Sequence, residues 1–134
     1  LDLTVSTGDV TVSSVTCEED ITIGVSTGKT YLTDVACKNL TSTGSTGDIS
    51  LKNVISTENI SVERSTGDVT LDRSDAAELF IMTSTGDVEG SLLTNKVFII
   101  KTDTGRINVP NSITGGRCEI TTDTGDIKIS ILED

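Results

Sequence analysis

Ser65-Thr66-Gly67-Asp68-Val69 is the stretch that decides the fold, because its Thr-Gly step recurs through the whole sequence. Seven copies of the step are regularly spaced, with successive glycines 19 or 20 residues apart. These glycines are Gly8, Gly28, Gly47, Gly67, Gly86, Gly105 and Gly125. A fixed period of about 20 residues is typical of a solenoid, in which one repeat cannot bury its apolar face alone and must stack on its neighbours.

Apolar residues alternate with polar ones on both sides of each glycine. Positions two and four after the glycine are mostly Val, Ile or Leu, and so are positions seven and five before it. Such alternation predicts short, half-buried strands on either side of a glycine corner, where glycine supplies a positive φ. A further apolar column stands seven residues after the glycine, at Val15, Val35, Val54 and Leu93, with Ser74 and Ser112 in other repeats.

The sequence therefore predicts an all-β protein, a single-stranded parallel β-helix (β-solenoid) of about seven coils of 19–20 residues. We expect right-handed winding, because right-handed crossovers dominate parallel connections. Stacking of the coils in chain order would place Arg106 between Asp87 and Asp126. The repeat makes residues 1–134 one domain, and Leu1 already lies within it, so we expect a fragment of a longer protein.

Composition excludes several classes of partner. The net charge is −11 and there is no histidine, whereas nucleic acids and anionic lipids attract basic surfaces. No stretch approaches the ~20 apolar residues of a membrane span, so we expect no direct membrane insertion by this segment. The three aromatic residues are Tyr31, Phe80 and Phe98.

The cysteines leave two interpretations open. Cys17 and Cys37 each stand nine residues after their glycine, so they should be neighbours in adjacent coils. In-register strands about 4.8 Å apart allow either a stack of free thiols or a Cys17–Cys37 disulfide. The redox state of the pair therefore stays undecided at this stage.

Carboxylates are the only candidates for catalysis or metal binding. Without histidine, acid–base chemistry would fall to the aspartates after glycine, of which Asp48, Asp68 and Asp87 should form consecutive rungs. A turn position explains these aspartates without any chemistry, so we expect no catalytic residue and no cofactor. Weak Ca²⁺ binding by Asp48, Asp68 and Asp87 is the remaining metal hypothesis.

The Ser-Thr-Gly-Asp-Val step at residues 6–10, 65–69 and 84–88 resembles a bacterial domain family of unknown function that carries an adhesin label. The resemblance covers the whole chain. It implies a β-solenoid of an envelope protein, often following a transmembrane segment, with no established catalytic residues. Departures from the motif at Lys29-Thr30 and at Gly44 are interpreted as ordinary repeat drift.

These observations favour a non-enzymatic interaction or scaffold module of a bacterial envelope protein. We expect an extracytoplasmic, cell-surface location, a tether outside residues 1–134, and an unidentified protein or glycan partner. End-to-end self-association through the open ends of the stack is a further expectation. The alternative is a carboxylate-based polysaccharide-active enzyme, which would need a groove with two or more carboxylates outside the repeat and aromatic residues for sugar stacking.

Overall fold

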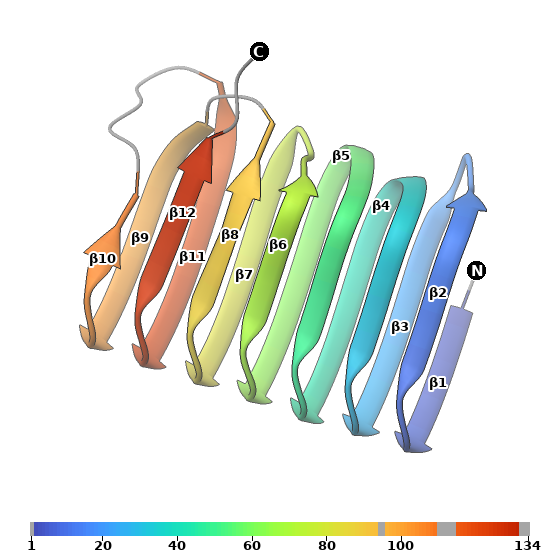
Figure 1. The fold of residues 1–134 in the computed structure, drawn as a ribbon, viewed down its shortest axis with the longest axis horizontal. Coiled ribbons are helices and arrows are strands. Elements are labelled where there is room, and N and C mark those ends of the chain that lie inside the picture. The colour runs from blue at the N-terminus through green and yellow to red at the C-terminus, as the bar shows by residue number, and fades with distance from the viewer. Residues whose placement is uncertain (1, 94–95, 110–114, 132–134) are drawn as a thin grey trace.

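The computed structural model describes residues 2–93, 96–109 and 115–131, and all of its regular elements are strands. The predicted fold class is confirmed: parallel strands stack into a β-solenoid of about six turns (Figure 1). The strands are β1 (Asp2–Thr7), β2 (Val10–Thr16), β3 (Asp20–Thr27), β4 (Thr30–Thr46), β5 (Ile49–Thr66), β6 (Val69–Ser74), β7 (Glu78–Thr85), β8 (Val88–Leu92), β9 (Lys96–Thr104), β10 (Ile107–Asn108), β11 (Gly116–Thr124) and β12 (Ile127–Ile131).

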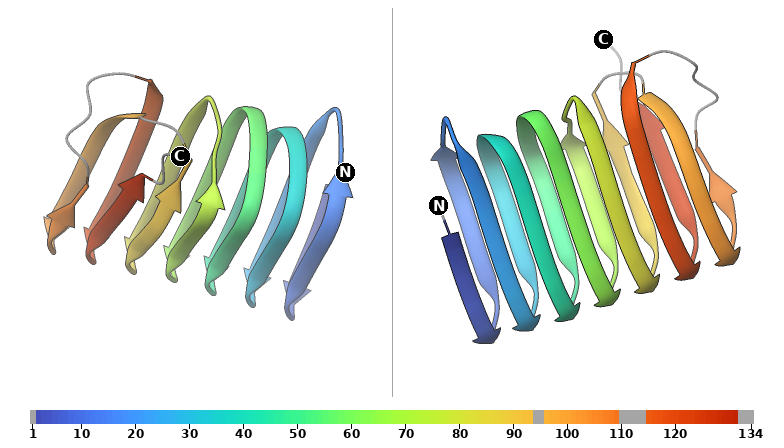
Figure 2. Two further views of the ribbon diagram at one scale, coloured as in Figure 1. Left: turned by 45° about the horizontal axis from the view of Figure 1, so that its top comes forward. Right: turned by 180° about the vertical axis from the view of Figure 1, so that it is seen from behind.

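The strands form two walls that face each other across the core (Figure 2). The first wall holds the strands before each glycine, in the order β1, β3, β4, β5, β7, β11, β9. The second wall holds the strands after each glycine, in the order β2, β4, β5, β6, β8, β12, β10. β4 and β5 belong to both walls because each continues through the bend.

The glycine corners have the predicted conformation. All seven of the regularly spaced corner glycines have φ between 130° and 154°, a region that side chains with a Cβ rarely adopt. The corners also stack too closely for a side chain, since a Cβ on Gly67 would lie 2.1 Å from the carbonyl oxygen of Gly47. Glycine is thus required at this position by both backbone conformation and space.

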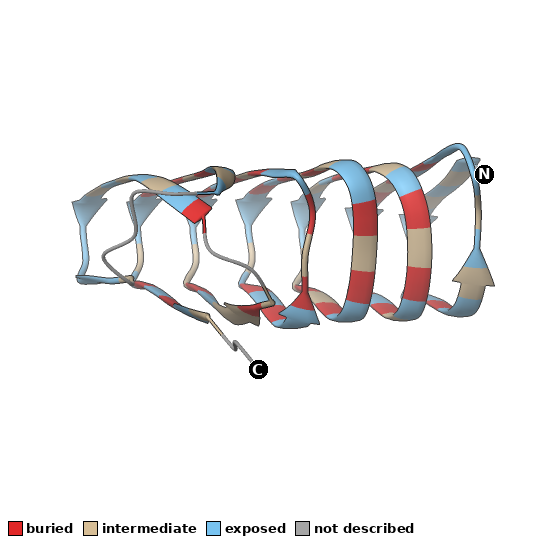
Figure 3. Cartoon of the chain, turned by 90° about the horizontal axis from the view of Figure 1, so that it is seen from above, coloured by how far each residue is buried: buried red, intermediate tan, exposed pale blue. Residues whose placement is uncertain are grey.

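The core lies between the walls and consists of the predicted inward columns (Figure 3). Leu79 and Ile81 of β7 are 0% and 2% exposed, as the alternation predicts. Threonines three residues before the corner glycines also face inward, and Thr83 Oγ1 donates to the carbonyl oxygen of Gly67 at 3.1 Å. Thr122 and Thr102 make the equivalent bonds to Gly86 and Gly125. These hydroxyls bind glycine carbonyls of the neighbouring coil.

The predicted order of the coils is wrong at one end of the stack. β11 lies between β7 and β9, and β12 lies between β8 and β10. The coil of β11 and β12, called the inserted coil below, is therefore stacked between two coils that are consecutive in sequence. Ile120, for example, pairs with Ile81 on one side and Ile100 on the other. Arg106 consequently lies beyond Asp126 rather than between Asp87 and Asp126. The physical reason is that each inward column has similar chemistry in every coil, so the repeat does not specify which coils are neighbours.

The apolar column seven residues after the glycine also differs from the prediction at one residue. Leu92, rather than Leu93, pairs with Ser74 and is fully buried, because the register shifts between Leu71 and Ser74. The coil of β8 is thus shorter by one residue at this bend. Ser112, assigned to the same column, lies outside the described residues.

Candidate functional site

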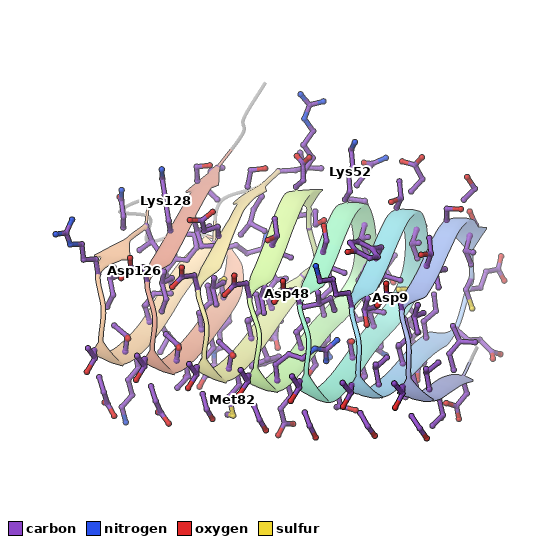
Figure 4. All side chains as sticks on the ribbon, turned by 60° about the horizontal axis from the view of Figure 1, so that its bottom comes forward. Asp9, Asp48, Lys52, Met82, Asp126 and Lys128 are labelled. Atoms are coloured by element: carbon purple, nitrogen blue, oxygen red, sulfur yellow. The ribbon has the colours of Figure 1, made fainter. Side chains whose placement is uncertain are left out.

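The structure places Asp48, Asp68 and Asp87 on consecutive rungs at the glycine corners. Figure 4 labels Asp9, Asp48 and Asp126 of this series. The backbone N–H of Asp68 donates to Asp48 Oδ1, and that of Asp87 donates to Asp68 Oδ1, both at 2.9 Å. Each carboxylate therefore links its own coil to the next one in the stack.

The same bonds continue through the inserted coil. The backbone N–H of Asp126 donates to Asp87 Oδ1 at 2.9 Å, and that of Arg106 donates to Asp126 Oδ1 at 2.8 Å. At the other end, Lys29 N–H donates to Asp9 Oδ1 at 3.0 Å. The corner aspartates thus have a structural role that explains their recurrence. Within the described residues, no group of three or more His, Cys, Asp or Glu side chains is placed to hold a metal, and Ca²⁺ binding stays a prediction.

A buried arginine corrects the interpretation of the irregular repeats as drift. Arg64 is 2% exposed and points into the core, where Nη2 donates to Ser42 Oγ at 3.0 Å and to Thr30 Oγ1 at 3.3 Å. Its Nη1 donates to the carbonyl oxygen of Glu63 at 3.0 Å. Burial lowers the pKa of Arg64. The two hydroxyls replace apolar residues of their columns because the guanidinium needs acceptors.

Gly44 completes this cluster. A Cβ at Gly44 would lie 2.5 Å from the carbonyl oxygen of Val25 and 3.0 Å from Arg64 Nη1, so the absent side chain makes room for both the neighbouring backbone and the guanidinium. The irregular positions in three neighbouring coils therefore serve one buried side chain. The sequence signal was present, since Thr30, Ser42, Gly44 and Arg64 all fall on inward columns.

A small hollow on the outer face of the first wall is the best candidate for a binding site. It measures about 140 Å³ and lies over β5, β7 and β11. Phe80 and Met82 form its apolar part, and Met82 is 52% exposed. Ser61 and Thr121 add hydroxyl groups at its sides.

Two carboxylates, Glu63 and Glu119, also line the hollow. The lining residues include no Lys or Arg, and the ion pair found across the described residues joins Lys96 to Asp75 rather than involving either glutamate. Glu119 pairs with Phe80 only because the inserted coil lies beside β7. In chain order Ile99 would occupy that place, so sequence reasoning missed the site. The available signal was the pair Phe80 and Met82 at outward positions where most repeats are polar.

A sequence model of the family described as Toastrack DUF4097 matches residues 1–134. The chain belongs to the Toastrack DUF4097 family. No curated protein and no solved structure matches it. Toastrack is a domain family of unknown function with a β-helix-like fold, so the family agrees with the architecture and assigns no activity. None of the described residues of this Toastrack chain forms a helix long and apolar enough to cross a membrane.

The cysteines of the Toastrack chain are all free thiols in the structure. Cys17 and Cys37 follow the paired residues Thr16 and Ala36, which places them in adjacent coils as predicted. Cys37 is buried, and burial raises the pKa of its thiol. Burial also raises the pKa of Cys118 to about 12. These protonated, enclosed thiols are poor nucleophiles, so they offer no catalytic group.

Proposed function

We propose that this Toastrack chain is a non-enzymatic interaction module, an adhesin-like scaffold of a bacterial envelope protein. The observation that carries the proposal is the role of the corner aspartates, which accept backbone N–H groups of the next coil instead of facing a substrate. Two regular walls, whose outward residues are mostly polar, offer a long, rigid surface to a partner.

The location and partner belong to the same proposal. The resemblance to envelope proteins supports an extracytoplasmic, cell-surface position with a tether outside residues 1–134. The partner is a protein or a glycan that contacts the outer face of the first wall, where the hollow over β5, β7 and β11 lies.

The hollow also favours the alternative function to a limited degree, because it combines Glu63, Glu119 and Phe80. A polysaccharide-active enzyme would use two such carboxylates as acid and base or nucleophile. However, Glu63 and Glu119 lie on β5 and β11, with β7 between them. Glu63 pairs with Met82 and Glu119 with Phe80, so the glutamates are two strand spacings apart, about 9.6 Å, and also two residues apart along the strands, about 6.6 Å. The resulting Cα–Cα separation of about 11.7 Å exceeds the ~5–5.5 Å between the carboxyl groups of retaining enzymes and the ~6.5–9.5 Å of inverting ones. The hollow is also well below the ~300–1,000 Å³ of ordinary ligand pockets.

A glycan array combined with a reducing-sugar assay separates the two functions. We expect no release of reducing ends from any arrayed glycan, whether or not one of them binds. Turnover that disappears in the double variant Glu63→Gln, Glu119→Gln would contradict the interaction module and establish the enzyme instead.

A further inference from the structure

The outer face of the first wall changes character where the inserted coil meets β7. At the equivalent outward positions, β3 and β4 carry small or polar residues such as Thr22 and Thr41, whereas β7 presents Phe80 and Met82. Met82 is the most exposed of the large hydrophobic side chains in the described residues. An exposed Met and a half-buried Phe beside each other provide a polarizable apolar surface suited to contact with a partner.

The charged side chains that line this hollow have one sign. Glu63 and Glu119 both line it, whereas the cations nearest in register on the same face, Lys101 opposite Thr121 and Arg117 two residues before Glu119, are not among its lining residues. The protein as a whole carries a net charge of −11, so an anionic ligand would be repelled at this face.

We propose that this hollow binds a basic side chain, Lys or Arg, of a partner protein. The inference rests on the proposed function as an interaction module and names the chemical class of its partner. The aliphatic stem lies on Phe80 and Met82, and the cationic group lies toward Glu63 and Glu119. Lys and Arg are the residues that combine an apolar stem with a charged end.

The size and lining of the hollow fit such a side chain. Its volume of about 140 Å³ is suited to one extended Lys or Arg side chain. Phe80 can contribute a cation–π contact, worth about 0.5–1 kcal/mol at an exposed site. The hydroxyls of Ser61 and Thr121 can accept hydrogen bonds from ammonium or guanidinium N–H groups.

An NMR titration of ¹⁵N-labelled protein with pentalysine tests the proposal. We expect shift changes concentrated at residues 61–63, 80–82 and 119–121. The double variant Glu63→Gln, Glu119→Gln should weaken binding about tenfold, since each exposed charge pair contributes roughly 0.2–1 kcal/mol. The matched control, Glu18→Gln with Glu89→Gln, removes the same charge from exposed residues outside the hollow and should change the Kd less than about twofold.

A third variant tests the apolar contribution. Met82→Thr introduces the residue that β11 carries at the paired position, Thr121, and that β4 carries in the same column, Thr43, so the wall should fold normally. We expect it to weaken binding without changing net charge. Equal weakening by both glutamine pairs, shifts spread along the corner aspartates, or no binding would overturn the proposal. Failure of pentalysine to bind would leave the interaction module standing, whereas sugar turnover would remove that function itself.

Discussion

Lys96 Nζ lies 2.7 Å from Asp75 Oδ1, and the ion pair reaches across the inserted strand. Lys96 belongs to β9, which pairs with β11, and β11 pairs in turn with β7. The register partner of Lys96 is Gly116, where a Cβ would lie 1.7 Å from the carbonyl oxygen of Ala77, and the lysine itself is 2% exposed. The pair therefore attaches the end coil to the stack independently of the strand pairing.

Removal of one partner of this pair should destabilise the protein. Asp75→Ala would leave the ammonium of Lys96 buried without its carboxylate, and we expect a loss of about 3 kcal/mol in the free energy of unfolding. Urea denaturation measures the change. A double-mutant cycle with Lys96→Met should show strong coupling, and additive effects would contradict the interpretation.

The Arg64 cluster predicts a rescue. Ser42→Ala removes one acceptor of the buried guanidinium and should cost about 1–3 kcal/mol of unfolding free energy. The same change in an Arg64→Met background should cost clearly less, because no charge then needs the hydroxyl. Thermal denaturation of the four proteins provides the comparison, and an equal cost in both backgrounds would argue against the cluster.

Cys118 predicts a loss of stability at alkaline pH. Its pKa is raised from 9.0 to about 12 by burial, so the folded state retains a proton that the unfolded state loses. This contribution is complete below pH 9 and declines by up to about 1.4 kcal/mol per pH unit as pH rises toward 12. Cys118→Ala should show a flatter dependence of unfolding free energy on pH than the parent between pH 9 and 11. The partly exposed Cys17, changed to Ala, is the matched control for removal of a thiol elsewhere in the fold.

Asp68 separates hydrogen bonding from charge repulsion in the corner ladder. Asp68→Asn keeps an Oδ1 acceptor for the N–H of Asp87, so stability at neutral pH should be retained. Asp68→Ala loses the acceptor and should cost about 0.5–1.5 kcal/mol. Added salt should raise the melting temperature of the parent by screening neighbouring carboxylates, and less so for the asparagine variant. A destabilised asparagine variant would show that the charge itself is needed.

The end coil predicts concentration-dependent self-association. Three of the five exposed large hydrophobic side chains in the described residues, Val97, Ile99 and Ile107, lie on β9 and β10. Exposed apolar residues on an unpaired edge favour pairing with another chain. Ile107→Lys should shift sedimentation toward the monomer, whereas Met82→Lys, at an equally exposed position away from the end, should not. A parent that stays monomeric at millimolar concentration would contradict this expectation.

Much of the fold could be predicted because it follows from local periodicity. Gly67 at a corner and Ile81 facing inward each follow from a spacing that the backbone imposes on every coil. The position of the inserted coil could not be predicted, because Ile120 fits beside Ile81 or Ile100 equally well. The Lys96–Asp75 pair that accompanies the insertion has no periodic signature. The hollow shares this limit, since Glu119 reaches Phe80 only through the insertion.

The inserted coil gives the molecule an unusual response to mechanical load. Tension on the chain beyond Ile131 acts on β11 and β12, which are held by a neighbour on each side, rather than on the outermost rung. The end coil cannot peel away first under such a pull, and several backbone hydrogen bonds must shear together. Forced unfolding is governed by the rate of crossing that barrier. A rod loaded from this end should therefore resist extension more strongly than one whose coils are stacked in chain order.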